Sequence, residues 1–212
     1  MKRIICTITL VLVAMTIVAC ASNGDYTIDA PDYIIINGEQ VQTSLTELHL
    51  RGQGLSNEDI AQLGYLTNLR RLDLRDNQIS DLSAIADLTN LVRLNLRGNQ
   101  ISDISVLANM PNLARLNLRD NQVDDISALT NLGSLWRINL RGNRVVDISP
   151  LAELTNLTEL NLRNNRVEDI SVLSNLMHLT ELNLRNNQIR DLSPLDSLTG
   201  LVDWDIRDNP VE

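Results

Sequence analysis

The sequence predicts an elongated solenoid, in which short similar coils stack and share one parallel β-sheet. Three observations predict it. A unit of 22 residues recurs from residue 69 onward, Leu and Ile return at fixed positions in every unit, and the chain contains no Phe and only 2% aromatic residues. A chain with so few large side chains can still fill a core if each coil repeats the aliphatic positions of the coil before it.

The repeat unit is best defined from Leu69, where it has the sequence LRRLDLRDNQISDLSAIADLTN. A looser version of 24 residues begins at Leu45, and a half unit runs from Leu201 to Glu212. Because chance does not return LxxLxLxxN at an unbroken period, we count seven repeats and a truncated eighth over residues 45–212. The template begins again at Leu91, Leu113, Leu135, Leu157 and Leu179.

Each unit opens with alternating polar and apolar residues. In Arg93-Leu94-Asn95-Leu96 the leucines face one side of an extended chain and the polar residues face the other. Neighbouring units would pair these strands at a spacing of about 4.8 Å. An Asn follows where the chain turns inward, and a buried amide there can bond to backbone groups of adjacent coils. This column is Asn77, Asn99, Asn121, Asn143, Asn165, Asn187 and Asn209.

After the turn, each unit has an Asp with a Ser two residues later. Both residue types cap the first N–H groups of a short helical turn. A row of metal ligands is the alternative, but these carboxylates are spread one per coil and do not converge on one point. The rest of the unit is too short for a long helix and fits a 3₁₀ or irregular segment. The column is Asp81, Asp103, Asp125, Asp147, Asp169 and Asp191.

The unit LxxLxLxxNxIxDISxLxxLTN resembles the 22-residue repeats of bacterial internalin-like leucine-rich-repeat proteins. The resemblance covers residues 45–212. It implies a leucine-rich-repeat solenoid of the α/β type, with a curved parallel β-sheet on the concave face, a 3₁₀ or irregular convex side, and partner proteins bound on the concave surface. We see no wall-anchoring motif, no long helical N-terminal cap and no immunoglobulin-like domain after the repeats, so the resemblance implies the architecture and binding mode but not host invasion.

The N-terminus differs in kind from the repeats. Lys2 and Arg3 precede an uncharged apolar run over residues 4–19, which is shorter than the roughly 20 residues that a spanning helix needs. The run ends in Ile-Val-Ala-Cys20, which resembles a bacterial lipobox, and the resemblance implies that Cys20 becomes the acylated first residue of the mature protein. We expect a lipoprotein signal peptide at residues 1–19 and a lipid-anchored protein on the extracytoplasmic face of the bacterial envelope. An ordinary signal peptide or an uncleaved anchor are the alternatives.

Both ends of the solenoid need covering. Residues 20–32 are polar and contain a proline, so we expect a tether between the lipid and the repeats. Residues 33–44 include an Asn-Gly pair, which predicts a β-hairpin that caps the first coil. At the other end, Trp204 takes a leucine position, and we expect it to lie across the open core.

Composition argues against several functions. Without residues 1–19 the chain keeps 16 arginines and 27 acidic residues, a net charge of −11, which disfavours nucleic acid. Cys6 lies in the signal peptide and Cys20 would be acylated, so no thiol or disulfide remains. His49 and His178 are the only histidines, and no catalytic triad, glycine-rich phosphate loop or His/Cys metal spacing is present. We therefore expect a monomeric binding module without metal or cofactor, and not an enzyme.

Arginine marks the candidate binding surface. The position after the second strand leucine is Arg in every unit, and the position before the first strand leucine is Arg in four consecutive units. On the exposed sheet face, residues 91–156 contribute six arginines and one acid. Because the guanidinium group binds carboxylates with two parallel hydrogen bonds, we expect this face to dock an acidic surface of a bacterial or host protein. The candidate contact residues are Arg71, Arg75, Arg93, Arg97, Arg115, Arg119, Arg137, Arg141, Arg163 and Trp136.

Other interpretations stay open. The same arginines could bind an anionic polymer such as a teichoic acid, a lipopolysaccharide or a sulfated glycan, and the chain could be a structural spacer. The arginine columns could also be a by-product of repeat duplication, with guanidinium groups that stack and bond to neighbouring Asn and Asp. Polymer binding should weaken steeply as salt rises, whereas a packed protein interface should lose less.

Overall fold

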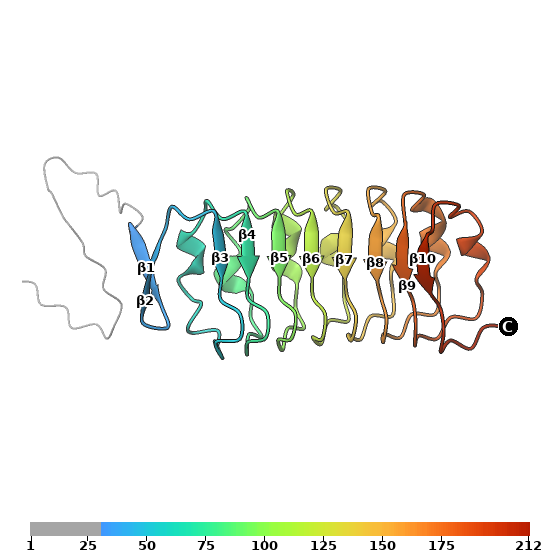
Figure 1. The fold of residues 1–212 in the computed structure, drawn as a ribbon, viewed down its shortest axis with the longest axis horizontal. Coiled ribbons are helices and arrows are strands. Elements are labelled where there is room, and N and C mark those ends of the chain that lie inside the picture. The colour runs from blue at the N-terminus through green and yellow to red at the C-terminus, as the bar shows by residue number, and fades with distance from the viewer. Residues whose placement is uncertain (1–30) are drawn as a thin grey trace, which may run out of the picture.

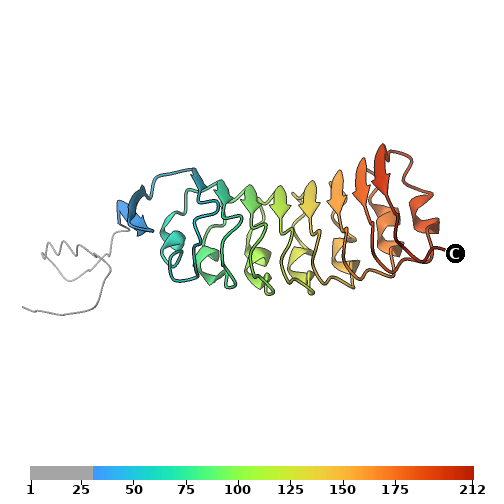
Figure 2. The same ribbon diagram turned by 60° about the horizontal axis from the view of Figure 1, so that its bottom comes forward.

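The computed structural model describes residues 31–212, which form one continuous solenoid (Figure 1). The predicted signal peptide, Cys20 and all but the last two residues of the predicted tether lie outside the described residues. The predicted leucine-rich-repeat fold is confirmed: eight strands form one parallel sheet in chain order, on the concave side, and 3₁₀ turns lie on the opposite side (Figure 2). Within residues 31–212, no helix is long and apolar enough to cross a membrane.

The sheet takes one short strand from each coil. The strands are β3 (Glu47–His49), β4 (Arg71–Asp73), β5 (Arg93–Asn95), β6 (Arg115–Asn117), β7 (Arg137–Asn139), β8 (Glu159–Asn161), β9 (Glu181–Asn183) and β10 (Asp203–Asp205). Equivalent residues of consecutive coils pair directly, as Leu94 does with Leu116. The longer first unit keeps this register, because Leu48 pairs with Leu72. Sequence positions therefore become straight columns on the surface.

A hairpin covers the N-terminal coil, as predicted. It consists of β1 (Tyr33–Ile36) and β2 (Glu39–Gln42), which pair antiparallel. Asn37 and Gly38 both have positive φ, 50° and 80°, which a two-residue hairpin turn with the twist of the strands requires. Ile34, Ile36 and Val41 are buried in the same apolar cluster as the repeats. The hairpin thus shields leucines that would otherwise face water.

The side opposite the sheet consists of short 3₁₀ turns. These are η1 (Leu63–Tyr65), η2 (Ser83–Ile85), η3 (Ser105–Asn109), η4 (Ser127–Leu129), η5 (Ser149–Leu151), η6 (Ser171–Asn175) and η7 (Ser193–Leu195). The predicted Asp caps are confirmed: the Ser105 N–H donates to Asp103 Oδ1 at 2.8 Å, and the other coils of the column repeat this bond. The predicted capping by Ser is wrong, because no serine hydroxyl of this column accepts a backbone N–H in the described coils; in three coils the hydroxyl donates to the Asp instead, as Ser83 does to Asp81.

The buried asparagines connect neighbouring coils, as predicted. Asn121 Nδ2 donates to the Leu118 carbonyl of its own coil and to the Leu96 carbonyl of the preceding coil, both at 2.9 Å. Its Oδ1 accepts the Ile101 N–H at 3.1 Å. Each such amide satisfies backbone groups that turn away from the sheet, where water cannot reach them.

The C-terminal end of the core is less well covered. Trp204 lies opposite Leu182 in the register, but it is 49% exposed, and the neighbouring Val202 is 84% exposed. The expectation that Trp204 closes the open core is therefore wrong. Trp204 is not among the side chains packed against the apolar cluster, and no described coil follows it.

Candidate functional site

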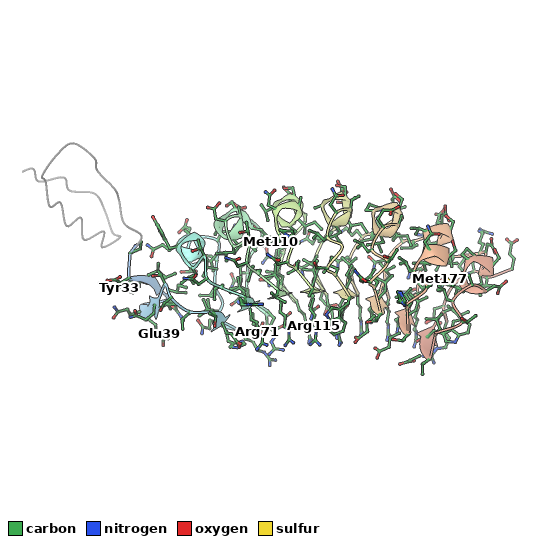
Figure 3. The ribbon with its side chains drawn as sticks, turned by 90° about the horizontal axis from the view of Figure 1, so that it is seen from above. Tyr33, Glu39, Arg71, Met110, Arg115 and Met177 are labelled. Carbon is green, nitrogen blue, oxygen red and sulfur yellow. The ribbon has the colours of Figure 1, made fainter. Side chains whose placement is uncertain are left out.

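The candidate site is the exposed face of the sheet, where the arginines form two columns. In the first, Arg71, Arg93, Arg115 and Arg137 pair in register on β4–β7. The second column follows the strands, and backbone hydrogen bonds keep it aligned, as from Gly142 N–H to the Arg163 carbonyl at 2.9 Å. Figure 3 labels Arg71 and Arg115, which project from the same side of the solenoid. The structure thus brings together all nine predicted arginines on one face.

A shallow groove of about 380 Å³ runs over β3–β7, and we call it the basic groove. The four arginines of the first column line it, with the neighbouring column of Asp73, Asn95, Asn117 and Asn139 beside them and Glu47 and His49 at its N-terminal end. A smaller groove of about 120 Å³ lies over β7–β10. Its charged lining is mainly acidic: Arg137, Glu159, Glu181, Asp203 and Asp205. The face therefore changes sign along the solenoid axis.

Several face arginines are already neutralised by carboxylates. In the first column, Arg71 Nη1 lies 2.6 Å from Glu47 Oε1, and Arg137 Nη1 lies 2.7 Å from Glu159 Oε2. In the second column Asp120 Oδ2 lies 2.9 Å from Arg119 Nε and 3.9 Å from Arg97 Nε. At these positions the arginines pair with neighbouring acids, as expected if repeat duplication alone produced the columns. Further pairs join Arg51 to Asp76, Arg75 to Asp73, Arg185 to Asp208 and Arg207 to Asp205.

Four face arginines have no such partner. Within residues 31–212, Arg93, Arg115, Arg141 and Arg163 form no ion pair, and their side chains donate no hydrogen bond. The Nε atoms of Arg115, Arg141 and Arg163 are also shielded from solvent without a partner in this part of the chain. A buried donor left unsatisfied costs about 1–3 kcal/mol. These side chains therefore hold unsatisfied charge and donors on the face.

Trp136 supports one of these four arginines. The Cζ atom of Arg115 lies 4.0 Å from the centroid of the Trp136 ring, which is a cation–π contact. Burial lowers the pKa of Arg115, and the charges of Arg93 and Arg137 lower it further. Burial likewise lowers the pKa of Arg141, followed by the charges of Arg119 and Arg163. Both shifts mean that the charged arginine is less favourable in the folded protein than in water.

The sequence did not reveal which arginines are paired. Glu47 reaches Arg71 because the first unit is two residues longer yet remains in register, and Asp120 serves two arginines of adjacent coils. The sign of this pairing in the sequence was the position directly after each second-column arginine, where Asp76, Asp120 and Asp208 replace Gly or Asn. No group of three or more His, Cys, Asp or Glu residues that could hold a metal occurs in the part of the chain that the structure describes.

Family models of leucine-rich repeats match most of the repeat region. A model of leucine-rich repeats in two copies matches residues 89–131 and 134–175, a second leucine-rich-repeat model matches residues 43–101, and a third matches residues 175–192. Comparison with curated proteins gave no match.

Solved structures extend the comparison. An internalin (inlF) from Listeria monocytogenes is 37% identical with a TM-score of 0.77; the match covers 81% of this chain and 52% of that one, so this chain spans about half its length. Internalin C2 (inlC2) from the same organism is 33% identical with a TM-score of 0.63, over 80% of this chain and 85% of that one. The structure of PEPR1–AtPEP1 is 28% identical with a TM-score of 0.66, over 71% of this chain and 23% of that one. The chain therefore belongs to the leucine-rich-repeat family, and its repeats are of the internalin-like kind.

Proposed function

We propose that this protein is a recognition module of the bacterial cell envelope that binds a partner protein through the basic groove and the arginines beside it. Leucine-rich-repeat proteins generally mediate protein–protein recognition, and their concave sheets supply extended binding surfaces. The observation that supports this most directly is the set of four face arginines without a carboxylate partner among the described residues. The protein holds them close together at a cost in repulsion, which an acidic partner would remove.

The arrangement favours a protein over a uniform polyanion. Carboxylates interrupt the positive columns, with Asp120 between Arg97 and Arg119 and Glu159 beside Arg137. The acidic groove over β7–β10 then reverses the sign along the first column, while Arg163 and Arg185 continue the second column beside it. A polymer of repeating negative charge would meet repulsion there, whereas a folded partner can match both signs with its own side chains.

The proposal includes attachment to the membrane. A lipid on Cys20 and the tether of residues 20–32 would hold the solenoid close to the membrane on the extracytoplasmic side, with its concave face free to meet other proteins. Binding, and not catalysis, is the activity that this scaffold supports, because internalin-like folds are typically non-enzymatic.

The test is partner capture by proximity labelling on intact cells. In one variant Arg93, Arg115 and Arg141 are changed to Glu, and in the matched control Arg144, Arg166 and Arg190, which lie off the face, are changed to Glu. Both variants change the net charge equally. We expect the first to lose the labelled partner and the control to keep it. Equal capture by all three proteins, with folding intact by circular dichroism, would contradict the proposal, and loss in both variants would indicate diffuse charge attraction to a polymer.

A further inference from the structure

We propose that the face contains two separate anion subsites, and that the partner presents two anionic groups on one extended segment. This inference rests on the proposed function and specifies its ligand. Subsite 1 is formed by Arg93 and Arg115 in the first column, and subsite 2 by Arg141 and Arg163 in the second.

Subsite 1 lies in the basic groove on β5 and β6. Arg93 and Arg115 are adjacent in the sheet register, so their backbones are about 4.8 Å apart. The arginines on either side, Arg71 and Arg137, already bind Glu47 and Glu159. The stack on Trp136 fixes the Arg115 guanidinium. An incoming anion therefore meets two adjacent unpaired guanidinium groups, one of which is held in place by the tryptophan ring.

Subsite 2 repeats this pattern two coils further along the solenoid. Gly142 N–H donates to the Arg163 carbonyl, which keeps the Arg141 and Arg163 coils in register. The arginines on either side are again occupied: Arg119 by Asp120 at 2.9 Å, and Arg185 by Asp208 at 2.6 Å. The residues that follow Arg141 and Arg163 are Gly142 and Asn164, which carry no charge to neutralise them. Both subsites are thus pairs of free arginines between two occupied ones.

The distance between the subsites follows from the register. They are offset by two coils, about 10 Å along the axis, and by four residues, about 13 Å along the strands, which places them about 16 Å apart. An extended polypeptide rises about 3.3 Å per residue and turns successive side chains to opposite faces. The same-face spacing nearest to this distance is four residues, about 13 Å, and the long arginine and acidic side chains cover the remainder. A segment that crosses the sheet obliquely, with acidic side chains four residues apart, would occupy both.

The ligand group is a carboxylate or a phosphate, because both accept paired hydrogen bonds from a guanidinium fork. Side chains of Asp or Glu and phosphorylated side chains are the two sources in a protein partner. The preference for a carboxylate or a phosphate depends on the charge and size of the group. A direct comparison of peptides that carry each group measures this preference.

The experiment uses 12-residue synthetic peptides that carry two Glu either four or two residues apart and no other charge, and the same pair with phosphoserine in place of Glu. Affinity for the purified protein is measured by fluorescence anisotropy at roughly 0.15 M salt. We expect the four-residue spacing to bind at least about tenfold more tightly than the two-residue spacing, because only the former engages both subsites. The peptide series that binds more tightly, with Glu or with phosphoserine, identifies the anionic group.

Variants assign the effect to the subsites. R93Q/R115Q and R141Q/R163Q should each abolish the advantage of the four-residue spacing, whereas R144Q/R166Q, which loses the same charge away from the face, should keep it. Equal binding of both spacings, equal loss in the control, or no binding of any peptide would overturn the inference. If the peptides are not distinguished but charge reversal still abolishes partner capture, the proposed function stands and the two-subsite ligand does not.

Discussion

Replacing Asn121 with Ala tests whether the buried asparagines hold neighbouring coils together. The side chain is 9% exposed and makes four hydrogen bonds to backbone groups of two coils, one of them long at 3.4 Å. At about 0.5–1.5 kcal/mol for each bond, and with the partner groups left buried and unpaired, we expect a loss of about 3 kcal/mol in the free energy of unfolding. Since small proteins are stable by about 5–15 kcal/mol, urea unfolding followed by far-ultraviolet circular dichroism would detect it easily.

The matched control is Asn117→Ala, four residues earlier. Asn117 lies on the open sheet face, where its Oδ1 accepts only the Arg119 N–H at 3.1 Å and water can replace it. We expect a loss below about 1 kcal/mol there. If the two variants lose the same small amount, the buried amides do not connect the coils energetically, and the reasoning is wrong.

Three further predictions concern charge and attachment. Arg141→Gln should raise the free energy of unfolding by about 0.5–1 kcal/mol at low salt, because it removes a charge that burial disfavours and that Arg119 and Arg163 repel. The gain should shrink at 1 M salt, which screens the repulsion, and a loss at both salt concentrations would contradict the prediction. Acid should destabilise the fold, because the Arg207 side chain lowers the pKa of Asp205 to about 2 and the Ser127 backbone N–H lowers the pKa of Asp125. The stability that these carboxylates contribute is present above their ordinary pKa of 3.8 and is lost as pH falls toward about 2. Urea unfolding at pH 5, 3 and 2 measures it, and a flat profile would refute it. Cys20→Ser should abolish incorporation of radiolabelled palmitate in growing cells, and persistent labelling would exclude Cys20 as the lipid site.

Repetition explains why the fold could be predicted from the sequence. Once Leu94 and Leu96 repeat at equivalent positions in successive units, stacking is the arrangement that buries them all, and Asn99 must then supply the bonds that the turning backbone lacks. The Asn-Gly pair at residues 37–38 likewise determined the hairpin, because few other sequences accept two successive positive φ angles. These features depend on local chemistry or on an exact period.

The ends and the ion pairs could not be predicted in the same way. Trp204 occupies a leucine position, and its exposure depends on whether anything packs outside it, which the repeat pattern does not state. Whether Arg97 or Arg119 is neutralised depends on how the Asp120 side chain reaches across two coils. Side-chain reach between columns is a property of three-dimensional spacing, and the sequence shows that an acid is present in the column but not which arginine it pairs with.

The direct pairing of equivalent residues in consecutive coils has a consequence for how such a gene can change. An in-frame deletion or duplication of one whole unit, such as residues 113–134, joins two coils whose surfaces already match, so the product should still fold. The same event would shift every position beyond it by about 4.8 Å relative to those before it. Unequal recombination between repeats could therefore alter which ligands fit the face in discrete steps, without any point mutation in the contact residues themselves.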